Sequence, residues 1–218
     1  MKQKAVLFSE MTPEPEWEDE FNAWYDEEHV PLRMKVPGFA GAQRYRRNER
    51  DYCVVYDLDE TAVLQTAAYR EVKDEPSERT AWMLRSVSNF TRYIGRPVGA
   101  RYRAGFDGAV TAPVLYPVFF DVPEDRVEEF DHWYEEDHVP TLMECEEWLA
   151  CRRFALEVAD PGQFNRLALH YLASPLALES NARAKARASE WRARLAQEPW
   201  FKGSYMVFER HGPRSVAQ

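Results

Sequence analysis

The feature that most constrains the fold of this chain is an internal repeat. Residues 20–34 and 129–143 align without gaps, and nine of the fifteen positions are identical. Three further positions exchange carboxylates or amides, for example Asn22 and Asp131. The offset of 109 residues is half of the 218-residue chain. A fixed repeat of this kind indicates a duplicated unit. We therefore predict two domains, residues 1–105 and 106–218.

Each copy has the pattern of a β-α-β-β-α-β unit. Prolines open the helical stretches, Pro37-Gly38 marks a turn, and runs of Val and Tyr favour strands. The first copy is predicted to have strands at 4–11, 39–47, 52–58 and within 90–103, and helices at 16–29, 60–71 and 77–89. The second is predicted to have strands at 113–121, 148–158, 164–173 and 202–210, and helices at 124–138 and 175–196. This order is typical of the ferredoxin-like arrangement.

The flanks of the repeat are less similar. Gln43-Arg44-Tyr45 aligns with Arg152-Arg153-Phe154, and after a small insertion Val54-Val55-Tyr56 aligns with Leu169-His170-Tyr171. A four-stranded sheet with helices on one face leaves its other face bare, and a second copy can cover it. The predicted fold class is therefore α+β, with tandem ferredoxin-like βαββαβ units forming an intramolecular dimeric α+β barrel around a hollow interior.

Composition excludes several classes of partner. The chain carries 28 Lys and Arg against 37 Asp and Glu, a formal charge of -9, which repels a phosphate backbone. No apolar run approaches the ~20 residues of a membrane helix, and the first residues lack a signal-peptide pattern. Three cysteines form no framework and suit a reducing compartment. We expect a cytoplasmic protein that binds neither nucleic acid nor membrane, and that is a monomer or a weak homodimer.

The repeated motif also resembles a known family. Trp-Tyr, three acidic residues and His-Val-Pro, followed in the first copy by Pro-Gly-Phe and a strand with Arg44-Tyr45, resemble the dimeric α+β barrel superfamily. Within it the EthD-like branch, which includes methylmuconolactone isomerases, is the most similar, although its members are usually single units that dimerise. The resemblance implies a small-molecule pocket between sheet and helix, without a bound organic cofactor. It also implies isomerisation, cyclisation, decarboxylation or oxygenation of aromatic or lactone-like compounds, or an auxiliary role in catabolism.

Carried over residue by residue, the resemblance implies a pocket histidine at His29 and at His138. It also implies a tyrosine on the second strand, which is Tyr45 here. The second copy departs from this pattern, because Phe154 stands where the hydroxyl is expected. The two halves are therefore not expected to be equivalent. The candidate catalytic residues are His29, Tyr45 and His138.

The helical spacing supports a position of His29 on the inward face of its helix. Phe21, Tyr25 and His29 follow i, i+4 and i+8, so they share the inward stripe of an amphipathic helix. An imidazole at the end of such a stripe is suited to proton transfer near neutral pH, and a facing tyrosine hydroxyl is suited to hold a substrate oxygen. The alternative is structural: the imidazole hydrogen-bonds a backbone carbonyl and closes the helix, and its occurrence in both copies favours this.

Six further residues are candidates for substrate binding, and each has a structural alternative. They are Trp24, Tyr25, Arg44, Trp133, Tyr134 and Arg153. The tryptophans at helical spacing are more typical of a core than of a ligand platform. The arginines have the chemistry to clamp a substrate carboxylate, and equally to pair with the acidic helices.

Metal and nucleotide cofactors are not expected. Asp26 with His29 and Glu135 with His138 have the i, i+3 spacing of di-iron bundles, but carboxylates from two further helices are missing at recognisable spacing. No haem signature and no Gly-rich phosphate-binding motif is present.

The sequence leaves three functional hypotheses. The first is a cofactor-independent acid–base enzyme, of isomerase, cyclase or lyase type, acting on an aromatic, lactone or polyketide-like compound. The others are a non-catalytic protein that sequesters a hydrophobic metabolite and a structural scaffold.

Overall fold

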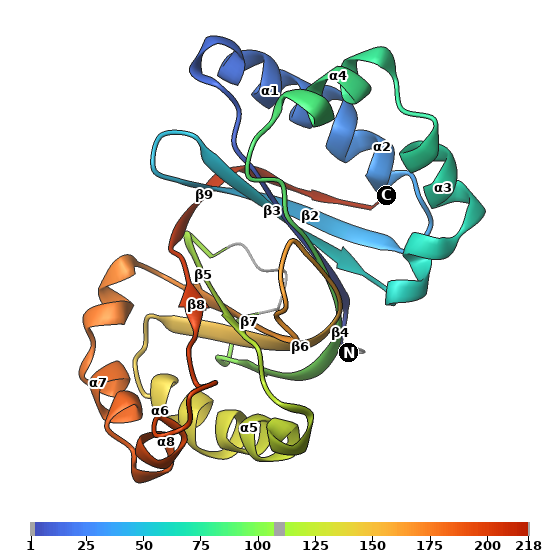
Figure 1. The fold of residues 1–218 in the computed structure, drawn as a ribbon. Coiled ribbons are helices and arrows are strands. Elements are labelled where there is room, and N and C mark those ends of the chain that lie inside the picture. The colour runs from blue at the N-terminus through green and yellow to red at the C-terminus, as the bar shows by residue number, and fades with distance from the viewer. Residues whose placement is uncertain (1–2, 107–111, 218) are drawn as a thin grey trace. The chain divides into compact units, whose positions relative to one another are not determined.

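The computed structural model describes residues 3–106 and 112–217 (Figure 1). Its contacts divide the chain into two compact units. Unit 1 comprises residues 1–96, 157–161 and 211–218, and unit 2 comprises 97–156 and 162–210. These units differ from the predicted domains of 1–105 and 106–218, which remain a prediction about the duplication. No helix among the described residues is both long and apolar enough to cross a membrane.

Unit 1 is an antiparallel sheet with helices on one face (Figure 1). Its hydrogen-bonded strand order is β4-β1-β3-β2. The strands are β1 (Ala5–Met11), β2 (Phe39–Arg47), β3 (Asp51–Leu58) and β4 (Arg92–Tyr102), the last continuing into unit 2. The helices are α1 (Glu18–Trp24), α2 (Val30–Met34), α3 (Ala67–Asp74) and α4 (Glu78–Ser86).

Unit 2 repeats this plan. Strand β7 pairs with β6 and β5, and β5 also pairs with β8 and β9. The strands are β5 (Val114–Phe120), β6 (Trp148–Asp160), β7 (Arg166–Leu172), β8 (Ser204–Tyr205) and β9 (Phe208–Val216). Strands β6 and β9 both continue into unit 1, to which residues 157–161 and 211–218 belong. The helices are α5 (Val127–Trp133), α6 (Val139–Leu142), α7 (Asn181–Arg187) and α8 (Glu190–Leu195). The α+β class and the two ferredoxin-like units predicted from the repeat are confirmed.

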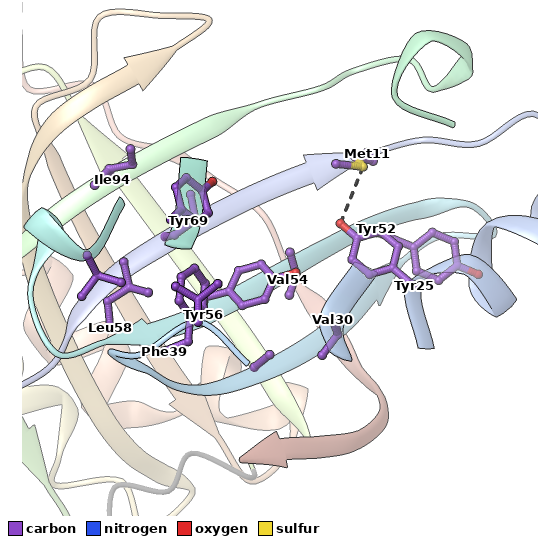
Figure 2. Packing of buried hydrophobic residues seen from close by; sticks show 14 of the residues in the cluster. Met11, Tyr25, Val30, Phe39, Tyr52, Val54, Tyr56, Leu58, Tyr69 and Ile94 are labelled. Atoms are coloured by element: carbon purple, nitrogen blue, oxygen red, sulfur yellow. Dashed lines mark hydrogen bonds between the residues drawn. The ribbon is translucent and has the colours of Figure 1, made fainter. Parts of the chain in front are cut away.

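The core of unit 1 lies between the sheet and the helices. Because strand side chains alternate between faces, Val54 and Tyr56 on β3 point toward the helices, as do Leu7 and Met11 on β1. Figure 2 shows Tyr56 beside Phe39 in this layer. An equivalent cluster fills unit 2. The cavities described below lie within these two layers.

Two details of the elements differ from the prediction. The helix expected over 175–196 is interrupted, because Ser180 and Ser189 cap new helices by accepting hydrogen bonds from the N–H groups of Arg183 and Arg192. The predicted alignment of Tyr56 with Tyr171 is also wrong by one residue. Tyr56 pairs with Ala42, and its counterpart is His170, which pairs with Cys151. A slip of one residue moves every side chain to the other face of the sheet.

Candidate functional site

A widened helical turn places the histidine of each copy. Residues Tyr25–His29 form a π-helical turn between α1 and α2, where the N–H of Val30 donates to the carbonyl of Tyr25. Pro31 has no N–H, and its ring would clash with the carbonyl four residues earlier, so a wider turn accommodates it. Tyr134–His138 form the same turn before Pro140. The histidine does not end the helix, since α2 and α6 continue beyond it.

In unit 1 this turn borders a cavity of about 380 Å³. The cavity lies on the helix side of the sheet, among side chains from β1, β3, β4, α3 and α4. Its volume falls in the ~300–1,000 Å³ range of small-molecule pockets. The polar side chains that line it include Tyr25, His29, Arg33, Tyr56, Lys73 and Arg92. The cavity therefore combines an apolar wall with ionisable groups.

His29 is a buried, neutral imidazole at this cavity. Its ring centroid lies 4.1 Å from that of Trp24 and 4.8 Å from that of Tyr25. Its Nδ1 is buried and has no hydrogen-bond partner. Burial, together with the positive charges of Arg33 and Arg44, lowers the pKa of His29 well below its ordinary value. Buried polar atoms are nearly always paired, so a free ring nitrogen here is a functional signal.

A tyrosine on β3 supplies a second buried polar atom. The hydroxyl of Tyr56 has no hydrogen-bond partner, and burial raises its pKa above the ordinary value. The neighbouring Tyr25 hydroxyl is 3.6 Å from the sulfur of Met11, a weak acceptor (Figure 2). Burial raises the pKa of Tyr25 to about 12. Both phenols are therefore hydrogen-bond donors at neutral pH and not bases.

Positive side chains outnumber negative ones around this cavity. Arg33, Lys73 and Arg92 line it, against the single carboxylate of Asp160. The Arg33 guanidinium donates to the carbonyl of His29 over 3.1 Å, and that of Arg92 donates to the hydroxyl of Tyr69 over 3.1 Å. These bonds fix two positive groups at the cavity wall. The cavity is thus suited to a ligand that carries or develops negative charge.

Unit 2 has the equivalent cavity, reduced to about 100 Å³. It is lined by His138, whose Nδ1 is also buried without a partner. Burial and three nearby arginines lower the pKa of His138 to about 3. His170, at the position of Tyr56, accepts a hydrogen bond from Trp148 over 3.1 Å. Tyr116, which takes the place of Leu7 in the strand register, fills part of the space.

The structure does not bring Tyr45 to the predicted site. Arg44 turns toward the helices, where its guanidinium donates to Asn22 and Asp26. Neighbouring strand residues point to opposite faces, so Tyr45 lies on the other face, as does Gln43. Tyr45 is not among the residues that line the cavity of His29. The tyrosine of the sheet that lines this cavity is Tyr56 of β3.

The two predicted arginines pair with acidic helices and do not line the cavities of the two histidines. Arg44 is buried and lies 4.4 Å over the ring of Tyr25, and neither it nor Arg153 lines the larger cavity of its own unit. Arg153 pairs with Glu135 and donates to the carbonyl of Asp131 over 2.9 Å. Pairing with the acidic helices is therefore what the structure shows for both arginines.

The predicted aromatic residues divide between core and cavity. Trp24 donates through Nε1 to Thr80 over 2.8 Å and packs in the core. Tyr25 borders the cavity of unit 1, and Trp133 and Tyr134 border that of unit 2. The residues that sequence reasoning missed are mainly strand residues such as Tyr56, because the one-residue slip in the alignment concealed which face they occupy.

No group of three or more His, Cys, Asp or Glu side chains among the described residues is placed to hold a metal ion.

No family model and no curated protein matches the chain. Solved structures do resemble it. An anthrone oxidase-like protein superposes with a TM-score of 0.68 at 12% identity, covering 99% of this chain and 94% of the other. A putative monooxygenase from Lactobacillus acidophilus gives a TM-score of 0.57 at 7% identity, covering 95% and 94%. A heme-degrading enzyme from Listeria monocytogenes gives 0.50 at 8% identity, covering 94% and 99%.

These likenesses show a fold of the dimeric α+β barrel kind. They contradict the expected function, because the similar structures are described as oxidase-like, monooxygenase or heme-degrading proteins. The hypothesis of a cofactor-independent isomerase, cyclase or lyase is wrong, and the non-catalytic sequestering protein is not supported either.

The described cavities do not fit haem. A haem site needs an axial ligand facing a slot that holds the whole macrocycle. His29 and His138 are of the right residue type, but their cavities measure about 380 Å³ and about 100 Å³. Both volumes are too small for a porphyrin with its propionates.

Proposed function

We propose that this protein oxidises a small polycyclic aromatic compound with dioxygen in the cavity of unit 1. The observation that carries the proposal is His29, a buried neutral base with an unpartnered Nδ1 beside a cavity of about 380 Å³. The fold likeness to an anthrone oxidase-like protein and a putative monooxygenase supports an oxidative reaction. An anthrone suits such a site, because its CH₂ group between two rings is acidic and its conjugate base is an aromatic enolate.

The first step is proton transfer. His29 accepts a proton from the substrate CH₂ group, and the electron pair moves onto the substrate oxygen as an enolate. A base with a lowered pKa needs the product anion beside it to stabilise the imidazolium, and the enolate supplies that charge. Arg33 and Arg92 stabilise the enolate, and the Tyr56 hydroxyl donates to it.

Oxidation follows without a further donor of electrons. The electron-rich enolate transfers electrons to O₂, and a C–O bond forms at the deprotonated carbon to give a peroxide anion. This anion takes the proton back from the His29 imidazolium, which gives a hydroperoxide and restores the neutral imidazole. Loss of water from that hydroperoxide leaves a ketone. In sum the CH₂ carbon loses two hydrogens and gains one oxygen atom, and the second oxygen atom leaves as water. The substrate is oxidised and O₂ is reduced.

We further propose that the chain is a tandem fusion of two ferredoxin-like units. The repeated π-helical turn and the matching strand registers support it. The specific resemblance to EthD-like proteins stays a prediction.

The three cysteines are free, which suits the reducing cytoplasm expected for a protein of this kind.

The test is oxidation of anthrone by the purified chain, followed by oxygen uptake and quinone absorbance against the spontaneous rate. We expect His29→Gln to lower kcat/KM by about 10²–10⁴-fold with little change in thermal stability. His132→Gln, an exposed histidine outside the cavities, is the matched control and should retain the activity. Equal activity in wild type and His29→Gln would refute the role of this imidazole.

The pH profile is a second readout of the same experiment. Because the pKa of His29 is lowered, its neutral, reactive form persists below the ordinary histidine pKa of about 6.5. We expect kcat/KM to stay level as the pH falls from 8 through 6.5 and to decline only at lower pH. A decline centred at 6.5 would indicate a solvent-exposed base in place of His29. Addition of haemin should neither raise the rate nor give a saturable absorbance change.

A further inference from the structure

The cavity of unit 2 has a cationic wall that the proposed oxidation does not use. Arg183, Arg187 and Arg192 all line it. The first two lie four residues apart on α7, so they share one face of that helix, and the third lies on α8. No carboxylate belongs to the lining of this cavity. Three positive charges therefore face one small space.

Among the described residues, none of these three arginines forms an ion pair with a carboxylate. Arg183 donates to the carbonyl of Leu178 over 2.7 Å, and Arg192 donates to the carbonyl of Arg187 over 3.2 Å. The side chain of Arg183 is also hydrogen-bonded to Tyr116, and the guanidinium of Arg192 lies 5.6 Å from the ring centroid of Phe201. Each guanidinium carries five N–H donors, so donors remain for a ligand. Nearby acids are engaged elsewhere: Asp137 accepts from Trp133 and Ser189. Such an arrangement of like charges is stabilised by a bound anion.

Electrostatics within the cavity agree with this. Burial, and then the charges of Arg187 and Arg183, lower the pKa of Arg192 below its ordinary value. The same arginines, after burial, lower the pKa of His138 to about 3. His138 is thus neutral, and its unpartnered Nδ1 is a second polar group without a partner in the protein. Repulsion among the three arginine charges favours the binding of a negatively charged ligand.

The rest of the cavity is aromatic and small. Phe120, Trp133, Tyr134, Trp148 and Phe201 contribute rings to it. A volume of about 100 Å³ is of the order needed for a single aromatic ring, since an apolar cavity of about 150 Å³ binds benzene. Arg187 is exposed, whereas Arg183 and Arg192 are half-buried, so the charges extend from the cavity wall to the solvent. The interior is suited to a ring and the guanidinium wall to a carboxylate.

We propose that unit 2 binds a single-ring aromatic carboxylate, with its ring among these aromatic side chains and its carboxylate on Arg183, Arg187 and Arg192. The site is separate from the cavity of His29, which lies in unit 1. A guanidinium forms bidentate hydrogen bonds with a carboxylate, which gives both affinity and orientation. This proposal does not depend on the oxidation proposed above.

Isothermal titration of the full chain with benzoate tests the proposal, with neutral benzamide as the matched probe. We expect saturable binding of benzoate at one site and binding of benzamide at least about tenfold weaker. Arg187→Gln and Arg192→Gln should each weaken benzoate binding about tenfold or more. Arg194→Gln, an exposed arginine of α8 outside the cavity lining, should leave it unchanged. Equal binding of benzoate by all four proteins would overturn the proposal.

Two further titrations distinguish this site from a general anion site and from the cavity of unit 1. Inorganic phosphate should bind at least about tenfold more weakly than benzoate, because it cannot fill the aromatic interior. Phosphate binding equal to that of benzoate would overturn the aromatic part of the proposal. His29→Gln should bind benzoate like wild type, whereas loss of binding in that variant alone would place the ligand in unit 1. Circular dichroism confirms that each variant is folded, and Arg187 is exposed, so its replacement leaves the core intact.

Discussion

At the scale of single residues, Tyr56 and Tyr52 provide contrasting tests of what a buried hydroxyl does. Both are on the helix-facing side of β3. The Tyr52 hydroxyl donates to Glu18 over 2.5 Å, whereas the Tyr56 hydroxyl has no partner in the protein. An unpaired buried hydroxyl costs about 1–3 kcal/mol, and a paired one contributes about 1 kcal/mol. A hydrogen bond from the Tyr56 hydroxyl to a bound ligand would explain why the protein keeps this destabilising hydroxyl.

We therefore predict opposite effects of the same substitution. Tyr56→Phe should raise the free energy of unfolding by about 1 kcal/mol and lower the rate of anthrone oxidation about tenfold. Tyr52→Phe should lower the free energy of unfolding by about 1 kcal/mol and leave the rate nearly unchanged. Urea denaturation and oxygen uptake measure the two quantities. A Tyr56→Phe protein that is less stable and fully active would mean that this hydroxyl has a purely structural partner.

At the scale of elements, strand periodicity decides which arginine and which tyrosine belong to the site. Arg44 and Tyr45 are adjacent on β2, so they cannot both face the helices. The sequence proposed both as site residues, and the structure keeps neither at the cavity. The helix with its histidine was predictable, because the repeat and the i, i+4 stripe define it. The π-helical turn, the one-residue register of β3 against β7, and the interrupted helix depend on hydrogen bonds that no spacing reveals.

Arg44 gives a prediction at this scale, because it connects β2 to α1 and to the π-helical turn. Its guanidinium bonds to Asn22 and Asp26 and lies over the ring of Tyr25. Asp26 is 64% exposed, so solvent screens the ion pair and most of the effect comes from hydrogen bonds and ring contact. Arg44→Met should lower the free energy of unfolding by about 1–2 kcal/mol and change kcat/KM less than threefold. A raised KM with unchanged stability in urea would instead identify Arg44 as a substrate clamp.

At the scale of the whole molecule, the two units differ in the volume of the cavity beside the histidine. The same register position holds Leu7 in unit 1 and Tyr116 in unit 2, since Leu7 pairs with Tyr56 and Tyr116 pairs with His170. Phe39 in unit 1 and Trp148 in unit 2 also hold matching positions, and again the side chain in unit 2 is the larger one. Larger side chains thus account for a cavity of about 100 Å³ in place of one of about 380 Å³. Unit 2 shows that the fold accepts a tyrosine at this position.

This difference makes Leu7→Tyr a direct test of which unit carries the proposed oxidation. The larger ring enters a cavity that has room for it, so the free energy of unfolding should change by less than about 1 kcal/mol. The substrate should be displaced, and anthrone oxidation should fall to near the spontaneous rate. Tyr116→Leu, the matched change in unit 2, should leave that oxidation intact while enlarging the second cavity and altering benzoate binding. If Leu7→Tyr oxidised anthrone at the wild-type rate, the reaction would have to take place outside unit 1, and the two copies would exchange roles.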